Sequence, residues 1–238
     1  MQDLVAGADG CRTGWVVVKK DLLTNTTNIF INRSFAEVIA TAVGVSVLAV
    51  DIPIGLHEAA SRGGRECDIL ARKILGPPRA SSIFPPPVRP ALAASSYSEA
   101  LLKNRDSSPA GIGISRQCYG LFPKLREVDE AMTPDLQEKI REVHPELSFL
   151  EMNGGKSLPD SKRTLEGLRH RLELIQSSGF LQVGDWLHHY PKKQVAPDDV
   201  LDACAACWTA ERIHRGIATR IPVDPEMDNI GLRMEMWV

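Results

Sequence analysis

The stretch VSVLAVD, residues 45–51, decides the fold class that we predict for this chain of 238 residues. It is a continuous apolar run that ends in an acid, which is typical of a central β-strand covered on both faces. The preceding segment, SFAEVIATAV at 34–43, predicts an amphipathic helix, because Ser34 is a suitable N-cap and Glu37 follows three residues later. A helical crossover of this kind joins parallel strands, so we expect the strand ending at Asp51 to pair parallel to the chain's first strand.

Three short β-prone runs come before that helix, namely LVAGAD at 4–9, GWVVVKK at 14–20 and TNIFINR at 27–33. Turn-like residues separate these runs, and the spacing predicts an antiparallel meander. The elements predicted downstream are helices at 66–75 and 116–131 (the latter with a break or start at Pro123), a strand at 142–150, a helix at 161–179, a helix from Pro197 to Gly216 and an outer strand within 232–237.

Residues 77–90, PPRASSIFPPPVRP, contain six prolines and therefore cannot form a continuous helix or a central strand. We expect an insertion at about 57–135 within one domain that spans 1–238, since no linker-like tract divides the chain. Between residues 62 and 90 the basic side chains outnumber the acidic ones by four. The residues predicted to bind substrate phosphate are Arg62, Arg65 and Arg79 here, and Lys162 and Arg163 at the start of a later helix. The alternative is a solvated charged face without a ligand.

Composition excludes several classes of protein. Hydrophobic residues make up 43% of the chain and charged residues 24%, as in a globular rather than a disordered protein. The formal net charge is −2, so any contact with nucleic acid has to be local. The N-terminus lacks the features of a signal peptide and no apolar run reaches the ~20 residues of a membrane span, which predicts a cytoplasmic protein with no membrane partner. Five scattered cysteines, an odd number, indicate thiols in a reducing compartment.

The predicted order of three strands, a helix, an acid-ended strand and a late helix that opens with acids is that of the ribonuclease H-like architecture. Local motifs that agree with this order are GADGCRTGWVVV at 7–18, AVDIPIGL at 49–56, LFPKLREVDEAM at 121–132, EVHPELSF at 142–149, SKRTLEG at 161–167 and PDDVLDA at 197–203. Together they resemble an uncharacterised bacterial domain-of-unknown-function family described as predicted nucleases of ribonuclease H-like fold. The resemblance implies a three-layer α/β fold with a central mixed sheet, into which the Pro/Arg-rich insertion is built.

Carboxylates near the ends of predicted elements are the candidate catalytic residues. The resemblance places the first metal-binding carboxylate at Asp9, although an aspartate before Gly10 can equally serve a turn. Asp51 ends an apolar strand, where an ionised carboxylate is costly unless a metal, a charge or hydrogen bonds compensate it. Glu146, in the predicted strand at 142–150, is either a further ligand or proton-transfer group, or a structural acid paired with an arginine.

The final helix carries the other acids. Asp199 and Asp202 are three residues apart and so share one helix face, while one of Asp198 and Asp199 can instead be the N-cap. Small residues at 203–207 let this helix approach the sheet and bring its acids toward Asp9 and Asp51.

Asp9, Asp51, Asp199 and Asp202 as ligands suit Mg²⁺ or Mn²⁺, which prefer oxygen donors. Two such ions can stabilise the attacking and leaving oxygens of a phosphodiester, so we predict a metal-dependent nuclease acting on DNA or RNA. Two alternatives stay open: a phosphotransferase or ATPase of the related actin-like fold, and a non-catalytic module that binds nucleic acid or protein. The oligomeric state also stays open, a homodimer included.

Overall fold

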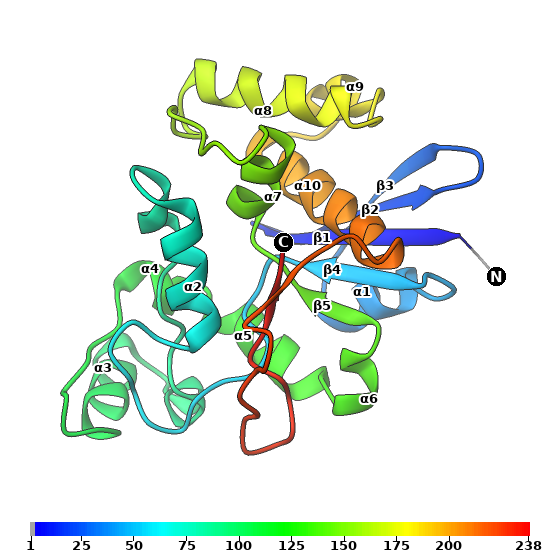
Figure 1. Ribbon diagram of the computed structural model, residues 1–238. Helices are drawn as coiled ribbons and strands as arrows, with labels where there is room; N and C mark the ends of the chain where they lie inside the picture. Colours follow the sequence, from blue (N-terminus) through cyan, green and yellow to red (C-terminus); the bar gives the residue numbers. More distant parts are fainter. Residues whose placement is uncertain (1–2) are drawn as a thin grey trace.

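The computed structural model describes residues 3–238, in which helices cover both faces of a five-stranded mixed β-sheet (Figure 1). The strands lie in the order β3-β2-β1-β4-β5. Their bounds are β1 Leu4–Cys11, β2 Gly14–Asp21, β3 Thr26–Asn32, β4 Val47–Val50 and β5 Ile140–Glu142. The predicted antiparallel meander of β1, β2 and β3 is confirmed. So is the parallel pairing of β4 with β1, in which Ala8 lies opposite Val50, and β5 continues the sheet parallel to β4.

Side chains of the central strands alternate between two apolar cores, one on each face of the sheet. On β2, Trp15 and Val17 enter one core, whereas Val16 and Val18 enter the other. The covering helices are α1 (Phe35–Thr41) and α5 (Phe122–Ala131) on the first face, and α7 (Pro145–Met152), α8 (Leu165–Ser177), α9 (Val183–His189) and α10 (Pro197–His214) on the second. The burial of both faces explains why the central strands are almost wholly apolar.

Helix α10 lies directly against β1 because both partners are small at the contact. A Cβ atom built on Gly7 would lie 2.0 Å from the backbone nitrogen of Cys207 and 2.5 Å from the carbonyl oxygen of Ala203. The sequence predicted this close approach from the small residues of the helix. Gly7 supplies the other half of the contact, since only a residue without a side chain fits there.

We expect Gly7→Ala to lower the free energy of unfolding by about 1–3 kcal/mol or more, because the methyl group forces α10 away from the sheet. Urea unfolding followed by circular dichroism measures the change. Gly120→Ala is the matched control, since Gly120 ends α4 (Arg116–Gly120) and a Cβ atom built on it would meet nothing within 4 Å. Equal stability of the two variants would contradict the tight packing of α10 on β1.

The segment between β4 and β5 contains the predicted insertion. Its elements are α2 (Glu66–Leu75), the short 3₁₀ turns η1 (Arg79–Ser82) and η2 (Arg89–Ala93), α3 (Tyr97–Asp106), α4, α5 and α6 (Pro134–Gln137). Figure 1 shows α2, α3 and α4 beside the sheet, whereas α5 packs on the sheet through the first core. The proline-rich run forms only η1 and the start of η2, as its composition predicted.

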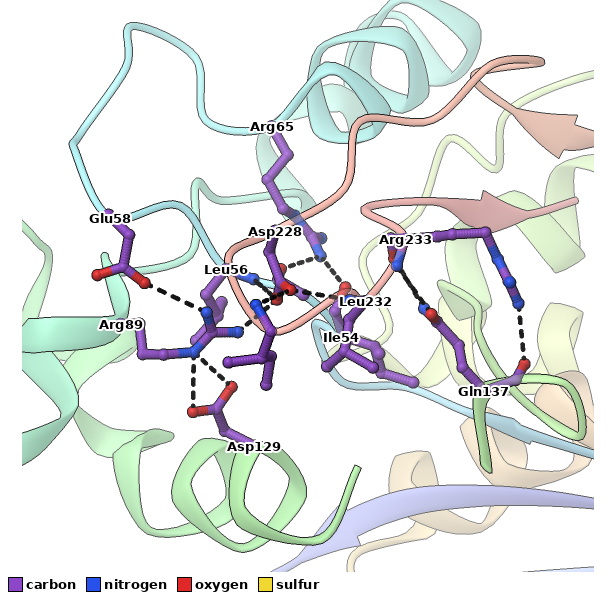
Figure 2. A network of polar contacts seen from close by, with 12 residues as sticks. Ile54, Leu56, Glu58, Arg65, Arg89, Asp129, Gln137, Asp228, Leu232 and Arg233 are labelled. Carbon is purple, nitrogen blue, oxygen red and sulfur yellow. Dashed lines mark hydrogen bonds and ion pairs between the residues drawn. The ribbon is translucent and has the colours of Figure 1, made fainter. Parts of the chain in front are cut away.

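Arg89 fastens this segment to the C-terminal part of the chain. Figure 2 shows its guanidinium group among three carboxylates. Its Nε lies 3.1 Å from Asp129, its Nη1 lies 3.2 Å from Glu58, and its Nη2 donates to Asp228. Asp228 also accepts a hydrogen bond from the backbone N–H of Leu56, 3.2 Å away. One arginine therefore links η2, α5, the loop after β4 and the C-terminal segment.

The prediction of a strand at 142–150 is wrong for every residue after the first. Only Glu142 belongs to β5, and α7 begins at Pro145. His144 is the N-cap, and its Nδ1 accepts a hydrogen bond from the backbone N–H of Glu146 at 3.2 Å. Proline in the first turn of a helix is favourable, so Pro145 starts a helix here rather than marking a strand edge.

The break or start predicted at Pro123 within 116–131 is confirmed, because α4 ends at Gly120 and α5 begins at Phe122 with Pro123 in its first turn. Two other boundaries differ from the sequence prediction. Helix α8 begins after Thr164, whose hydroxyl accepts from the backbone N–H of Gly167, so Ser161 is not its cap. The tail forms the strand β7 (Met236–Trp237), which pairs with β6 (Arg220–Ile221) in a two-stranded sheet and makes a single parallel bridge from Trp237 to Val143, directly after β5.

Within residues 3–238, no helix combines the length and the apolar character that a bilayer span requires.

Candidate metal centre

Three carboxylates from separate elements converge at one edge of the sheet. Asp9 lies in β1, Asp51 follows β4 and Asp202 lies in α10. One oxygen of each lies within 4.8 Å of the others. The parallel pairing carries Asp9 and Asp51 to the same edge, and the backbone N–H of Asp51 donates to Ala8 at 3.0 Å, which holds the two strand ends together. The contact at Gly7 lets α10 bring Asp202 to the same point.

Burial and mutual repulsion raise the proton affinity of this group. Burial raises the pKa of Asp9 well above its ordinary value, and the charges of Asp51 and Asp202 add to the effect. Burial and then Asp202 raise the pKa of Asp51 to about 7. Carboxylates crowded in this way are held ionised at neutral pH only when a cation balances them.

Lys162 supplies one such cation. Its ammonium nitrogen lies 2.6 Å from Asp202 and 3.6 Å from Asp198. The neighbouring aspartates, Asp202 first, raise the pKa of Lys162 above its ordinary value. Lys162, which was predicted to bind substrate phosphate, lines the cavity, and its ammonium group is paired with these carboxylates.

Glu146 lies on α7 beside the three carboxylates rather than in a strand. Its Oε1 accepts a hydrogen bond from Arg171 at 2.6 Å. This is the pairing with an arginine that the sequence analysis named as one alternative for Glu146. Its Oε2 is buried and has no hydrogen-bond partner, although the residue lines the same cavity as Asp9 and Asp51. A buried carboxylate oxygen without a partner is costly, and a bound cation or water would satisfy it.

Asp199 has a different position from the other predicted ligands. Its Oδ2 accepts from the backbone N–H of Ala196 at 2.8 Å. Ala196 is the N-cap of α10, so Asp199 supports the helix start from the N3 position and neither Asp198 nor Asp199 is the N-cap. It lines the cavity but is not part of the converging group of Asp9, Asp51 and Asp202. Burial raises the pKa of Asp199 to about 6.

A cavity of about 550 Å³ opens above the carboxylates. Residues from η1, α4, α5, α7, the loop before α8 and the start of α10 surround it. Arg79 and Arg163 line it, and among residues 3–238 neither makes an ion pair with a carboxylate. Arg79 donates to the carbonyl oxygen of Pro159 at 3.4 Å, while its Nε has no partner. These two guanidinium groups are available to an anion in the cavity.

Of the two other arginines predicted to bind substrate, Arg62 is exposed and does not line the cavity, whereas Arg65 lies in the cavity wall. Arg65 is 1% exposed, and its guanidinium group is surrounded by Asp68, Glu142 and the carbonyl oxygens of Ile54 and Gly55. Its donors are thus taken up inside the protein, and the predicted contact with substrate has no support in its surroundings.

Sequence reasoning missed two cavity residues. Lys124 on α5 lines the wall, and its ammonium donates to the carbonyl oxygen of Gly14 at 2.6 Å. His144 also lines the cavity, and burial lowers its pKa. Both belong to quoted motifs, at 121–132 and 142–149, so their positions in those motifs were the available signal.

We expect the stabilisation by Mn²⁺ to grow with pH. The folded-state pKa of Asp51, about 7, exceeds the ~4 of an unfolded aspartate, so the metal-free folded protein binds the proton more strongly. Stability from this group is therefore present below about pH 4 and is lost as the pH rises toward 7. A divalent cation removes the repulsion that causes the loss and competes with the proton. The rise in melting temperature caused by Mn²⁺ should be small at pH 5 and larger at pH 8.

Differential scanning fluorimetry in Mn²⁺ and in EDTA measures this rise in melting temperature at each pH. In the Asp51→Asn variant, the rise should depend less on pH than in the unmodified protein. Equal increments at pH 5 and pH 8 in the unmodified protein would show that these carboxylates do not govern metal binding.

Fold and site together define an α/β protein with a buried carboxylate centre in a cavity. A family model described as "Protein of unknown function (DUF429)" matches residues 7–227, and the chain belongs to this family. The matched region contains all three converging carboxylates, and the sequence-based resemblance to a family of unknown function is confirmed. No curated protein and no solved structure matches the chain.

Proposed function

We infer that this protein is a divalent-metal-dependent phosphodiesterase, a nuclease acting on DNA or RNA, with a fold of the ribonuclease H-like type. The observation that carries the inference is the convergence of Asp9, Asp51 and Asp202 from β1, β4 and α10 beneath a cavity with arginines in its wall. The donor set is entirely oxygen, which suits Mg²⁺ or Mn²⁺. Glu146 lines the same cavity beside this donor set, and its Oε2 has no hydrogen-bond partner.

Each group has a role that follows from its surroundings. Asp9, Asp51 and Asp202 would hold the ion, which would supply a Lewis acid for a phosphate oxygen and lower the pKa of water. Glu146 is oriented by Arg171, so its free oxygen can accept a proton from an attacking water. Arg79 and Arg163 bind phosphate oxygens of the substrate.

A metal-dependent cleavage assay tests the function. Protein stripped with EDTA is supplied with Mg²⁺ or Mn²⁺ and incubated with single-stranded, double-stranded and branched DNA and RNA, and separately with ATP. We expect cleavage of at least one nucleic acid, and only with metal present. Hydrolysis of ATP without cleavage would instead support the phosphotransferase or ATPase alternative. Binding of nucleic acid without any metal response would support the non-catalytic module.

A further inference from the structure

We propose that the centre holds a single divalent ion, and that the ammonium group of Lys162 takes the place of a second ion. The proposal rests on the proposed metal centre and specifies how many ions it binds. Two-ion sites place their cations about 3.5–4 Å apart, one beside each reacting oxygen. Here a permanent cation of the chain already lies against one of the three carboxylates.

The position of Lys162 carries the proposal. Its ammonium nitrogen lies 2.6 Å from Oδ2 of Asp202 and 3.6 Å from Oδ2 of Asp198, so it is bound on the side of the group nearest α10. The side chain keeps an exposed fraction of 39% and lines the cavity. An ammonium group has three donors. One donates to Asp202, and Asp198 at 3.6 Å is beyond hydrogen-bond distance, so donors remain for a phosphate oxygen.

The turn that carries Lys162 is held by several hydrogen bonds. The hydroxyl of Thr164 donates to the carbonyl oxygen of Ser161 at 2.9 Å, and Nη1 of Arg171 donates to the carbonyl oxygen of Asp160 at 3.1 Å. Arg171 is fully buried and also pairs with Glu146. The loop is therefore built onto the same residues that orient Glu146, and Lys162 has a fixed place beside the carboxylates.

The balance of charge leads to the same number of ions. Asp9, Asp51 and Asp202 carry three negative charges when ionised, and Arg171 already balances Glu146. Asp199 is directed to the backbone N–H of Ala196. Lys162 donates to the buried Asp202 and offsets its charge, whereas Asp198 is partly exposed and screened by solvent. One divalent ion then offsets the charges of Asp9 and Asp51. A second ion would meet the repulsion of both the first ion and the ammonium group.

Isothermal titration calorimetry of the metal-free full-length protein with Mn²⁺ measures the stoichiometry without reference to catalysis. We expect one ion per chain. Lys162→Gln should raise the affinity for Mn²⁺ by at least about tenfold or admit a second ion, because it removes a positive charge beside the ligands. Lys162→Arg should keep the stoichiometry of one. The matched control is Lys156→Gln, which removes the same charge from an exposed position in the same loop and should bind Mn²⁺ as the unmodified protein does.

Two ions bound by the unmodified protein would overturn the role of Lys162 while leaving the proposed metal centre intact. Unchanged stoichiometry and affinity in Lys162→Gln would do the same. No Mn²⁺ binding by the unmodified protein would overturn both this proposal and the proposed function. The measurement on the unmodified protein decides the number of ions even when a variant does not fold.

Discussion

Asp51→Asn is expected to lower metal-dependent hydrolysis by at least about a hundredfold while the protein stays folded. Loss of residues that merely support a metal ligand costs 10–100-fold in many metal sites, and Asp51 is a proposed ligand itself. Asparagine keeps the size of the side chain and one oxygen, so the packing around the end of β4 is retained. The substitution also removes one of three repelling charges, so the metal-free protein should unfold at the same or a higher temperature.

Initial rates with saturating Mn²⁺ and melting temperatures in EDTA measure the two effects separately. Asp106→Asn is the control, since Asp106 is exposed at the end of α3 and does not line the cavity. Retention of full activity by Asp51→Asn would remove this carboxylate from the catalytic centre.

Arg65→Met should have the largest effect on stability, a loss of about 3–5 kcal/mol, because it leaves buried acids without their cation. The guanidinium group of Arg65 lies 2.8 Å from Asp68 and 2.6 Å from Glu142, and both carboxylates are almost fully buried. It also donates to the carbonyl oxygen of Ile54 at 3.0 Å, a contact drawn in Figure 2. Methionine fills a similar volume but satisfies none of these groups.

Chemical denaturation compares Arg65→Met with Arg62→Met, which changes an exposed arginine three residues away. We expect Arg62→Met to alter stability by less than about 0.5 kcal/mol. A triple variant combines Arg65→Met with Asp68→Asn and Glu142→Gln. If it is more stable than Arg65→Met alone, the unpaired charges of the two acids cause the loss of stability. Similar stability of the two single variants would show that Arg65 can be dispensed with.

The central sheet could be predicted from the sequence because its signals are local. The apolar run ending at Asp51 and the helix at 34–43 together indicated a parallel pair, and β1 and β4 form it. The segment at 142–150 could not be assigned in the same way. Its apolar residues suit a strand or a buried helix, and only the capping of α7 by His144 decides between them.

Two carboxylates of the site, Asp9 and Asp51, could be placed together because neighbouring parallel strands end at one edge. The partners of the basic residues could not be predicted, since they come from distant parts of the chain. Arg65 pairs with Glu142, 77 residues away, and Lys162 pairs with Asp202, 40 residues away. Charge counted along the sequence shows that cations are present, but not which of them the protein has already neutralised.

The contact between β1 and α10 joins the beginning of the chain to residues 197–214. During translation β1 leaves the ribosome before α10, so the sheet face formed by Val5, Val16 and Ala49 lacks the helix that packs directly on β1 until α10 follows. At roughly 5–20 residues per second, this interval lasts on the order of 10–40 s. The nascent chain thus keeps part of an apolar sheet face exposed during this interval, and the carboxylate centre can assemble only after α10 has closed that face.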